Sequence, residues 1–328
     1  MMKIDPDRIG RILLIRLSAL GDCLAAIPVF MALRKRFPQA HLAWAVQDNF
    51  APLIENLPGL DELIIFPRQH WRRTPVIPKI KEAARLARHL RLRRFHAVVD
   101  VQSNMKSASL AFLSRAPIRI GHGREEAKEL SSWLNNVLVS PLPEMSHIVR
   151  RNLHLLSVLG VESCEPEFLL PPDPLSERRV RHWLRERDIA EGNYFLITPF
   201  CGHPAKEWPP RYFTQLAEAI VQVGGKVVFL CGPSLEKRTL ALIPSSCAGS
   251  VFLGPRTSIP EMVELIRFSR LTIGGDTGPV QIAGALGVAT LALFGPTSPE
   301  RSHPWGDARV VRLEANPSAV LKKIEDCI

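Results

Sequence analysis

The fold of this chain is decided by one stretch of sequence, Arg270-Leu271-Thr272-Ile273-Gly274-Gly275-Asp276-Thr277-Gly278-Pro279, with the small residues Val280-Gln281-Ile282-Ala283-Gly284-Ala285-Leu286 that follow it. Residues 270–273 predict a buried strand, and residues 280–286 predict a helix. Because the turn between them is rich in glycine, its N–H groups could approach a ligand that a Cβ would exclude. A helix N-terminus adds unpaired donors and partial positive charge, so the turn predicts a phosphate site.

The same alternation of apolar strand and helix runs through both halves of the 328-residue chain. Strands are predicted at Ile12–Ile15, Leu42–Val46, Leu63–Phe66, Ala97–Val101, Tyr194–Thr198, Lys226–Leu230, Val251–Leu253, Leu271–Ile273 and Thr290–Phe294. Helices are predicted near residues 24–36, 79–94, 104–114, 147–160, 176–187, 211–223, 258–269 and 279–287. Continuous apolar strands separated by helices are typical of parallel sheets covered on both faces.

A proline-rich segment, Leu170–Pro174, interrupts both patterns near the middle of the chain, because proline blocks the helix and the sheet ladder alike. We therefore predict two doubly wound α/β domains, residues 1–170 and residues 171–328. Open sheets of this kind bind ligands beyond the carboxyl ends of their strands. The strand ends that carry distinctive segments are those at Ile15, Thr198, Leu230, Ile273 and Phe294.

Composition is that of a globular protein, with 46% apolar and 23% charged residues. No apolar run reaches the ~18 residues of a membrane span, and the N-terminus lacks the apolar core of a signal peptide. The cysteines are Cys23, Cys164, Cys201, Cys231, Cys247 and Cys327, with no C-x-x-C pair. This scatter is typical of buried or free thiols in a reducing compartment, not of zinc sites or disulfides, so we expect a cytosolic protein.

Positive charge is concentrated in one region of the chain. There are 42 Lys and Arg against 32 Asp and Glu, and ten of the basic residues lie between positions 68 and 94, where Glu82 is the single acid. They are Arg68, Arg72, Arg73, Lys79, Lys81, Arg85, Arg88, Arg91, Arg93 and Arg94. Such a patch favours an anionic partner, which could be nucleic acid, an anionic membrane surface or a phosphorylated glycolipid. For residues 79–94 a solvated helix face is the alternative.

The loop after the first strand, Arg16–Asp22, contains one glycine and therefore lacks the three-glycine fingerprint of dinucleotide sites. Asp22 opens a predicted helix, where it would cap backbone N–H groups. The alternative is a carboxylate that projects from the sheet edge and acts as a general base. The residue types alone leave both roles open.

The loops after the strands that end at Thr198 and Leu230 carry a lysine and an acid. Lys206 precedes a helix that begins with proline, where it could bring a cation to a phosphate; an ordinary surface lysine is the alternative. Glu236 opens a helix, where it either complements the helix dipole or accepts hydrogen bonds from ribose hydroxyls. His203 is expected to be an ordinary loop residue.

Five segments follow one another in a characteristic order and spacing. They are Arg-Leu-Ser-Ala-Leu-Gly-Asp (16–22), Lys-x-Trp-Pro (206–209), Gly-Pro-x-x-Glu (232–236), Gly-x-Asp-Thr-Gly-Pro (274–279) and Leu-Phe-Gly-Pro-Thr-x-Pro (293–299). Together they resemble glycosyltransferase family 9, the lipopolysaccharide heptosyltransferase family. Residues 100–107 and the arginine segment 68–73 look most like the heptosyltransferase I branch, which acts on the Kdo of the inner core.

The resemblance implies the GT-B fold, in which two Rossmann-like domains face a cleft. Residues 1–170 would bind the acceptor and residues 171–328 the nucleotide sugar, and the family pattern allows the last helix to pack back on the N-terminal domain. It also implies an inverting, metal-independent transfer of heptose from ADP-heptose to a Kdo-bearing inner-core acceptor. The expected partners are therefore a nucleotide sugar, an anionic Kdo–lipid A acceptor and, peripherally, the cytoplasmic face of the inner membrane, with no cofactor, metal or nucleic acid.

Individual roles follow from the same resemblance. Asp22 is the implied general base, and Lys206 supplies charge to the departing diphosphate. The other implied nucleotide-sugar residues are Glu236, Asp276, Thr277, Gly278, Gln281, Cys201 and Gly202. The implied acceptor residues are Ser18, Gly21, Arg68, Arg72, Arg73 and Lys106. Asp276 is itself anionic, so we expect it to orient Lys206 or to brace its own loop rather than to contact phosphate.

The chain departs from the family at Gln281, where relatives usually have histidine, and glutamine cannot carry positive charge. The loop at residues 201–205 also lacks a hydroxyl side chain. Three alternatives stay open: a family 9 transferase with another nucleotide sugar or acceptor, a sugar-nucleotide epimerase of similar fold, and a non-enzymatic nucleic-acid binder. In an epimerase the basic region would have no function. A nucleic-acid binder is disfavoured because the sequence contains no recognised nucleic-acid-binding module.

Overall fold

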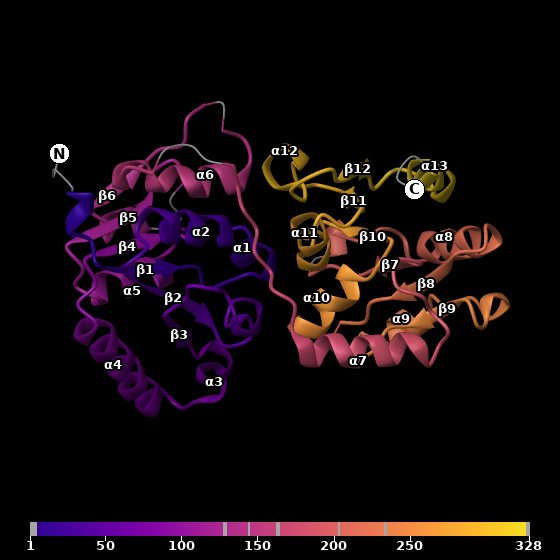
Figure 1. Ribbon diagram of the computed structural model, residues 1–328, viewed down its shortest axis with the longest axis horizontal. Helices are drawn as coiled ribbons and strands as arrows, with labels where there is room; N and C mark the ends of the chain where they lie inside the picture. The colour runs from indigo at the N-terminus through magenta and orange to yellow at the C-terminus, as the bar shows by residue number, and fades with distance from the viewer. Residues whose placement is uncertain are drawn as a thin grey trace. The chain divides into compact units, whose positions relative to one another are not determined.

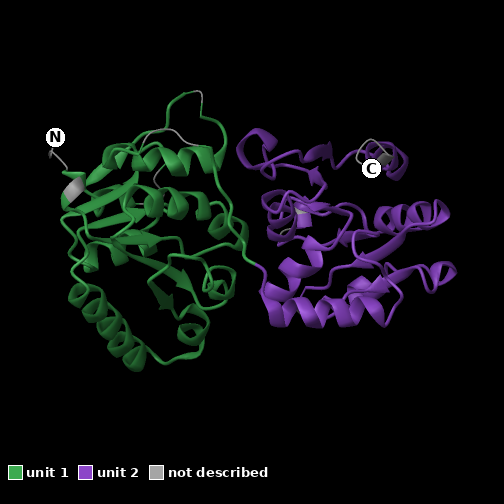
Figure 2. Cartoon of the chain, in the orientation of Figure 1, with its two compact units in different colours: residues 1–171 green, residues 172–328 purple. Residues whose placement is uncertain are grey.

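The computed structural model describes residues 5–126, 130–143, 145–161, 165–202, 204–232 and 235–325. The chain divides into two compact units, residues 1–171 and residues 172–328, coloured separately in Figure 2. Their division falls inside the predicted proline-rich linker. The predictions for Cys164, His203 and Cys327 lie outside the described residues.

The described part of the first unit contains one parallel sheet in the order β3-β2-β1-β4-β5-β6 (Figure 1). Its strands are β1 (Arg11–Ile15), β2 (His41–Gln47), β3 (Glu62–Phe66), β4 (Ala97–Asp100), β5 (Ile118–His122) and β6 (Val137–Val139). Ile15, the last residue of β1, pairs with Ala45 of β2 and with Asp100 of β4. The loops that leave these three strands therefore start from the same edge of the sheet.

Helices cover both faces of this sheet, as the continuous apolar strands predict. They are α1 (Leu20–Leu24), α2 (Ile27–Arg36), α3 (Arg68–Arg73), α4 (Val76–Leu92), α5 (Met105–Leu113) and α6 (Ile148–His154). Alternate residues of β1 face opposite ways. Leu13 packs with Leu90 of α4 and Leu110 of α5, while on the other face Trp44 of β2 stacks against Phe30 of α2.

The second unit repeats this plan, with a parallel sheet in the order β12-β11-β10-β7-β8-β9 within its described residues. Its strands are β7 (Tyr194–Thr198), β8 (Lys226–Phe229), β9 (Val251–Leu253), β10 (Leu271–Gly275), β11 (Thr290–Phe294) and β12 (Arg309–Arg312). Its helices are α7 (Pro174–Arg185), α8 (Pro210–Gln222), α9 (Glu236–Leu240), α10 (Ile259–Arg267), α11 (Gly278–Ala285), α12 (Pro299–Ser302) and α13 (Pro317–Glu325). Every residue of β7, β10 and β11 is buried, so these three strands form the centre of the unit.

The predicted pair of doubly wound parallel sheets is confirmed, and the differences are local. The helix expected near residues 24–36 is split into α1 and α2, because Pro28 can join a helix only in its first turn. Helix α7 begins at Pro174, earlier than predicted, because the Asp173 carboxylate accepts the Ser176 N–H at 2.8 Å and caps it. The sequence pattern does not predict β5, β6 or β12, which lie toward the sheet edges and carry a weaker apolar signal.

The last helix, α13, packs on α8 of its own unit. Val320 and Ile324 are buried with Phe213 and Leu216 of α8 in the core of the second unit. The apolar side of α13 is thus used in the core of its own unit. In the described part of the chain, no helix is both long and apolar enough to span a membrane.

Candidate active site

Asp276 is the centre of a polar cluster at the carboxyl end of β10. Its side chain is 12% exposed, and Oδ2 lies 3.0 Å from Nζ of Lys206, which arrives from the loop after β7. Its other oxygen, Oδ1, accepts a hydrogen bond of 3.2 Å from Nε2 of Gln281 on α11. Strands β7 and β10 are neighbours, so their loops meet at one sheet edge. The predicted pairing of Asp276 with Lys206 is therefore present.

Gln281 uses both amide hydrogens inside the protein. Besides its bond to Asp276, Nε2 donates to the backbone carbonyl of Ser302 at 2.6 Å. Both partners are acceptors, which fixes the amide nitrogen on their side. The group that Gln281 leaves for a ligand is its carbonyl oxygen, an acceptor. In this arrangement the residue links Asp276 to the end of α12, and it has no N–H left for a diphosphate.

Two glycines in β10 allow the end of β7 and the lysine loop that follows it to lie directly on the strand. A Cβ on Gly274 would stand 1.8 Å from Oγ1 of Thr198, and one on Gly275 would stand 2.5 Å from Sγ of Cys201. The Cys201 thiol in turn donates to the Lys206 carbonyl at 3.3 Å, and burial raises its pKa to about 11. These glycines are thus required by contacts within the protein, a reason that the sequence alone does not reveal.

The turn into α11 presents the predicted helix N-terminus. Thr277 stands at the N-cap and donates its hydroxyl hydrogen to the Gly275 carbonyl at 3.2 Å. Gly278 is the first helical residue and Pro279 follows, which places the open N–H groups of the first turn beside Asp276. The exposed Gly202 lies in the loop that carries Lys206.

Glu236 is the first residue of α9, after β8, and forms an ion pair with Arg256. Arg256 follows β9, and its side chain is 84% exposed. Sequence reasoning did not single out this arginine, because an exposed loop residue twenty positions away carries no local pattern. The pair brings a carboxylate and a guanidinium to the same sheet edge as Lys206 and Asp276.

In the first unit, Asp22 is the third residue of α1 and not its N-cap. Its Oδ2 accepts the N–H of the N-cap residue, Ala19, at 3.0 Å and contacts Nη2 of Arg16 at 2.7 Å. The side chain is 45% exposed, and Oδ1 has no partner among the described residues. One carboxylate oxygen is therefore held by the protein while the other is open to solvent.

Arg16 holds the Asp22 carboxylate in place from the interior of the protein. Its side chain is 11% exposed, and Nη1 donates to the Val101 carbonyl at 3.0 Å. The neighbouring Gln102 accepts the Leu17 N–H at 2.7 Å, so the loops after β1 and β4 are joined by two bonds. The role of Arg16 could not be predicted from the motif, because its contact with Val101 joins residues 85 positions apart in the sequence.

The predicted acceptor residues lie at this same sheet edge. Ser18 and Gly21 belong to the loop and helix that carry Asp22, and the exposed Lys106 is in the first turn of α5, after β4. The exposed arginines Arg68, Arg72 and Arg73 belong to α3, after β3. The Gln69 N–H donates to Asp48, which follows β2, and so anchors α3 to the sheet.

A family model for glycosyltransferase family 9 (heptosyltransferase) matches residues 83–327, about three quarters of the sequence. The chain belongs to glycosyltransferase family 9. The predicted enzyme class, a glycosyltransferase, is confirmed. The matched range contains four of the five motifs on which the resemblance was built, among them the Asp276 turn.

Relatives of this family 9 glycosyltransferase carry consistent names. "Lipopolysaccharide heptosyltransferase 3" of Escherichia coli is 27% identical, over 88% of this chain and 84% of the relative. "Lipopolysaccharide heptosyltransferase 1" of Pseudomonas aeruginosa is 26% identical, over 92% of this chain and 82% of the relative.

Solved structures of E. coli heptosyltransferase WaaC share the fold. The structure with ADP superposes with a TM-score of 0.81 at 21% identity, covering 97% of this chain and all of the other. The structure with ADP-2-deoxy-2-fluoro heptose gives a TM-score of 0.78 at 22% identity, covering 96% and 99%. The predicted GT-B fold of the family 9 enzyme is thereby confirmed.

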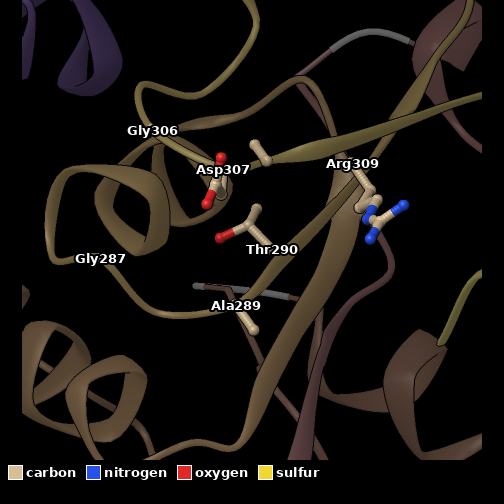
Figure 3. A pocket seen from close by; sticks show the side chains of 7 residues that line it. Gly287, Ala289, Thr290, Gly306, Asp307 and Arg309 are labelled. Carbon is tan, nitrogen blue, oxygen red and sulfur yellow. The ribbon is translucent and has the colours of Figure 1, made fainter. Parts of the chain in front are cut away.

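A cavity of about 580 Å³ lies away from these motifs, at the amino ends of β11 and β12. Thr290 and Arg309, the first residues of those strands, line it together with Asp307 (Figure 3). The motif residues of the family 9 enzyme leave the carboxyl ends of the strands instead. Among the described residues, no group of three or more His, Cys, Asp or Glu side chains is placed to hold a metal ion.

A buried histidine lies close to the Asp22 cluster in the first unit. His122 ends β5 and is 6% exposed, and burial lowers its pKa to about 4. The nearby Glu126 carboxylate opposes this shift, and the Arg16 guanidinium adds to it. The imidazole is therefore neutral at physiological pH, and its protonation would place a second cation beside Arg16.

His122 leads to a prediction about stability in acid. Its pKa is about 6.5 in an unfolded chain and about 4 in the folded protein, so between these values the unfolded state binds a proton that the folded state does not. Stability is therefore lost as the pH falls from about 6.5 toward 4. Replacing His122 by glutamine should reduce the loss between about pH 7 and about pH 5 by roughly 2 kcal/mol in urea unfolding.

The matched control is His182→Gln, because that histidine is 69% exposed on α7. It should lose as much stability in acid as the unaltered protein. An equal loss in His122→Gln would show that this imidazole is not the group responsible.

Proposed function

We propose that the protein transfers heptose from ADP-heptose to a Kdo-bearing inner-core lipopolysaccharide acceptor, with inversion at the anomeric carbon. The observation that carries the proposal is the set of family 9 motifs whose charged side chains lie at the carboxyl edges of the two sheets. Asp22 stands at one edge, and the Lys206–Asp276 pair stands at the other. The names of the lipopolysaccharide heptosyltransferase relatives, and the ADP-heptose analogue bound to WaaC, support this choice of donor and acceptor.

Asp22 is proposed as the general base. Oδ2 is oriented by Ala19 and Arg16, which leaves Oδ1 to accept the proton of the acceptor hydroxyl. As that proton moves to Asp22, the acceptor oxygen forms a bond to the anomeric carbon. The bond between this carbon and the ADP oxygen breaks on the opposite face, and its electron pair leaves with ADP.

Lys206 is proposed to stabilise the negative charge that develops on the leaving diphosphate. Its ammonium group is held by Asp276, and its side chain is 30% exposed, so the lysine is both oriented and accessible. The N–H groups at the start of α11 add oriented dipoles beside it. With these groups supplying the positive potential, transfer requires no divalent metal. Glu236 would hold the ribose hydroxyls, with Arg256 steering its carboxylate.

The acceptor is proposed to bind the first unit through its negative charges. The α3 arginines and Lys106 provide exposed cations on both sides of the β1 loop that carries Asp22. Carboxylate and phosphate groups of a Kdo–lipid A acceptor match such cations. Because this acceptor is embedded in a bilayer, the enzyme would work in the cytoplasm as a peripheral protein of the inner membrane.

The test is a direct assay of transfer. Purified protein with ADP-heptose and Kdo₂-lipid A should release ADP and yield a product heavier by one heptose in mass spectrometry, with or without EDTA. A panel of other nucleotide sugars and acceptors tests the alternative of a different family 9 transferase. No ADP release with any Kdo-bearing acceptor would refute the proposal, and loss of activity in EDTA would refute its metal-free part.

A further inference from the structure

One turn of α4 exposes three large aliphatic side chains. Val76 is 68% exposed, Ile77 is 69% exposed and Ile80 is 63% exposed. Val76 and Ile80 are one helical turn apart and Ile77 adjoins them, so the three form one apolar surface, here called the α4 tip. In the same helix, Ala87 and Leu90 are buried against the sheet. The first turn of the helix is therefore exposed, whereas the later turns bury Ala87 and Leu90.

The α4 tip is bordered by cations. Lys81, Arg85 and Arg88 are exposed and follow the apolar residues around the helix. Lys81 and Arg88 have no ion-pair partner in the described part of the chain. Glu82, the single acid of the region, is occupied elsewhere, since its carboxylate accepts bonds from His70 at 3.2 Å and Trp71 at 2.7 Å. These bonds lower the pKa of Glu82 and tie α4 to α3.

The combination of exposed aliphatic side chains and neighbouring cations favours one class of binding partner over others. A nucleic acid would contact the cations but would leave the aliphatic groups in water. An apolar protein surface would cover the aliphatic groups but would strip water from unpaired cations at its edge. The boundary between headgroups and acyl chains of an anionic bilayer satisfies both, because it offers hydrocarbon beside lipid phosphates.

We propose that the α4 tip is a membrane-docking site that inserts Val76, Ile77 and Ile80 into an anionic phospholipid bilayer. Lys81, Arg85 and Arg88 contact the lipid phosphates around them. This site would be the part of the protein that contacts the membrane during the proposed function. The inference rests on the proposed function only because that function explains why the protein would meet a membrane. Since α3 is bonded to α4 through Glu82, docking holds the acceptor-binding arginines close to the bilayer surface.

The test is flotation of the full-length protein with lipid vesicles. We expect binding to vesicles of phosphatidylethanolamine and phosphatidylglycerol, and little binding to vesicles of phosphatidylcholine alone. The double variant I77S/I80S should bind the anionic vesicles at least ~10-fold more weakly, because it lacks two isoleucines that insert into the bilayer on docking. High salt should weaken binding of the unaltered protein without abolishing it, since insertion of apolar groups is not screened.

The matched control is L175S/V223S, which removes two aliphatic side chains, 56% and 72% exposed, from the second unit. It should bind vesicles like the unaltered protein. Equal binding of I77S/I80S and the control would overturn the docking site, as would complete loss of binding in high salt. If the unaltered protein bound no anionic vesicle, or bound a nucleic acid more tightly, the bilayer assignment would be wrong.

A second measurement separates this inference from the proposed function. With a water-soluble Kdo acceptor that lacks lipid A, I77S/I80S should release ADP at the normal rate, because neither residue belongs to the active site. With Kdo₂-lipid A in vesicles the variant should be slower. Vesicle binding without any transfer by the unaltered protein would refute the proposed function and leave the docking site standing.

Discussion

Replacing Asp22 by asparagine should lower kcat by about 10²–10⁴-fold, the usual contribution of a general base. Asparagine keeps the shape of the side chain and can still accept the Ala19 N–H, so α1 should remain folded. It cannot take a proton from the acceptor hydroxyl, and it loses the ion pair with Arg16. Affinity for ADP should be unchanged, because ADP is assigned to the second unit. Steady-state ADP release and calorimetric titration with ADP measure the two quantities.

The control for this prediction is Asp307→Asn. Asp307 lines the cavity at the amino ends of β11 and β12, away from every motif residue, so its charge should not affect transfer (Figure 3). Turnover of Asp22→Asn within about threefold of the unaltered enzyme would remove Asp22 from the mechanism, since a lost general base costs at least about 10²-fold. A large effect of Asp307→Asn would instead point to a role for the cavity.

The sequence predicts the fold well where burial is continuous. Strands such as β10 and β11 are buried along their whole length, so their mainly apolar and small residues identify them. Edge strands give a weaker signal. Strand β12, with the sequence Arg-Val-Val-Arg, is largely exposed and has no apolar pattern to distinguish it from a loop.

The sequence predicts which residues belong to the candidate site, but it does not predict the contacts between them. The motifs identify Asp22, Lys206 and Asp276, because each follows a buried strand at the edge where ligands bind. They do not reveal that one oxygen of Asp22 is held by Arg16, or that Gly275 is required by Cys201. Those facts depend on which loops the sheet order brings together, and local sequence does not encode that order.

Gln281 illustrates the same limit. From its residue type and position, a neutral donor to the diphosphate is the natural expectation. The structure uses both of its N–H groups for Asp276 and for the carbonyl of Ser302, which lies 21 residues away in the sequence. A residue at a motif position can therefore use its side-chain N–H groups to position its neighbours, which leaves it no N–H to donate to the diphosphate.

Replacing Lys206 by methionine should lower kcat by about 10²–10³-fold, the cost of removing one donor to charge that develops in the transition state. The KM for the donor should rise less, because the diphosphate gains charge only as its bond to the sugar breaks. Lys226→Met is the matched control, since Lys226 pairs with Asp188 at the opposite edge of the same sheet. That pair is exposed, so its loss should cost no more than about 1 kcal/mol of stability and leave kcat unchanged.

Variants of Asp276 distinguish the effect of the Lys206 charge from the effect of the position of that charge. Asp276→Asn leaves the lysine in place but removes the carboxylate that orients it at 3.0 Å. If Asp276 acts through Lys206, this variant should be impaired alone, yet add little to the loss already caused by Lys206→Met. If the loss of kcat in the double variant equalled the product of the two single losses, Asp276 would act on the substrate independently of Lys206. Lys206→Arg provides the last distinction: it restores positive charge without the original geometry, so partial recovery of kcat is expected, and full recovery would mean that the orientation set by Asp276 is unimportant.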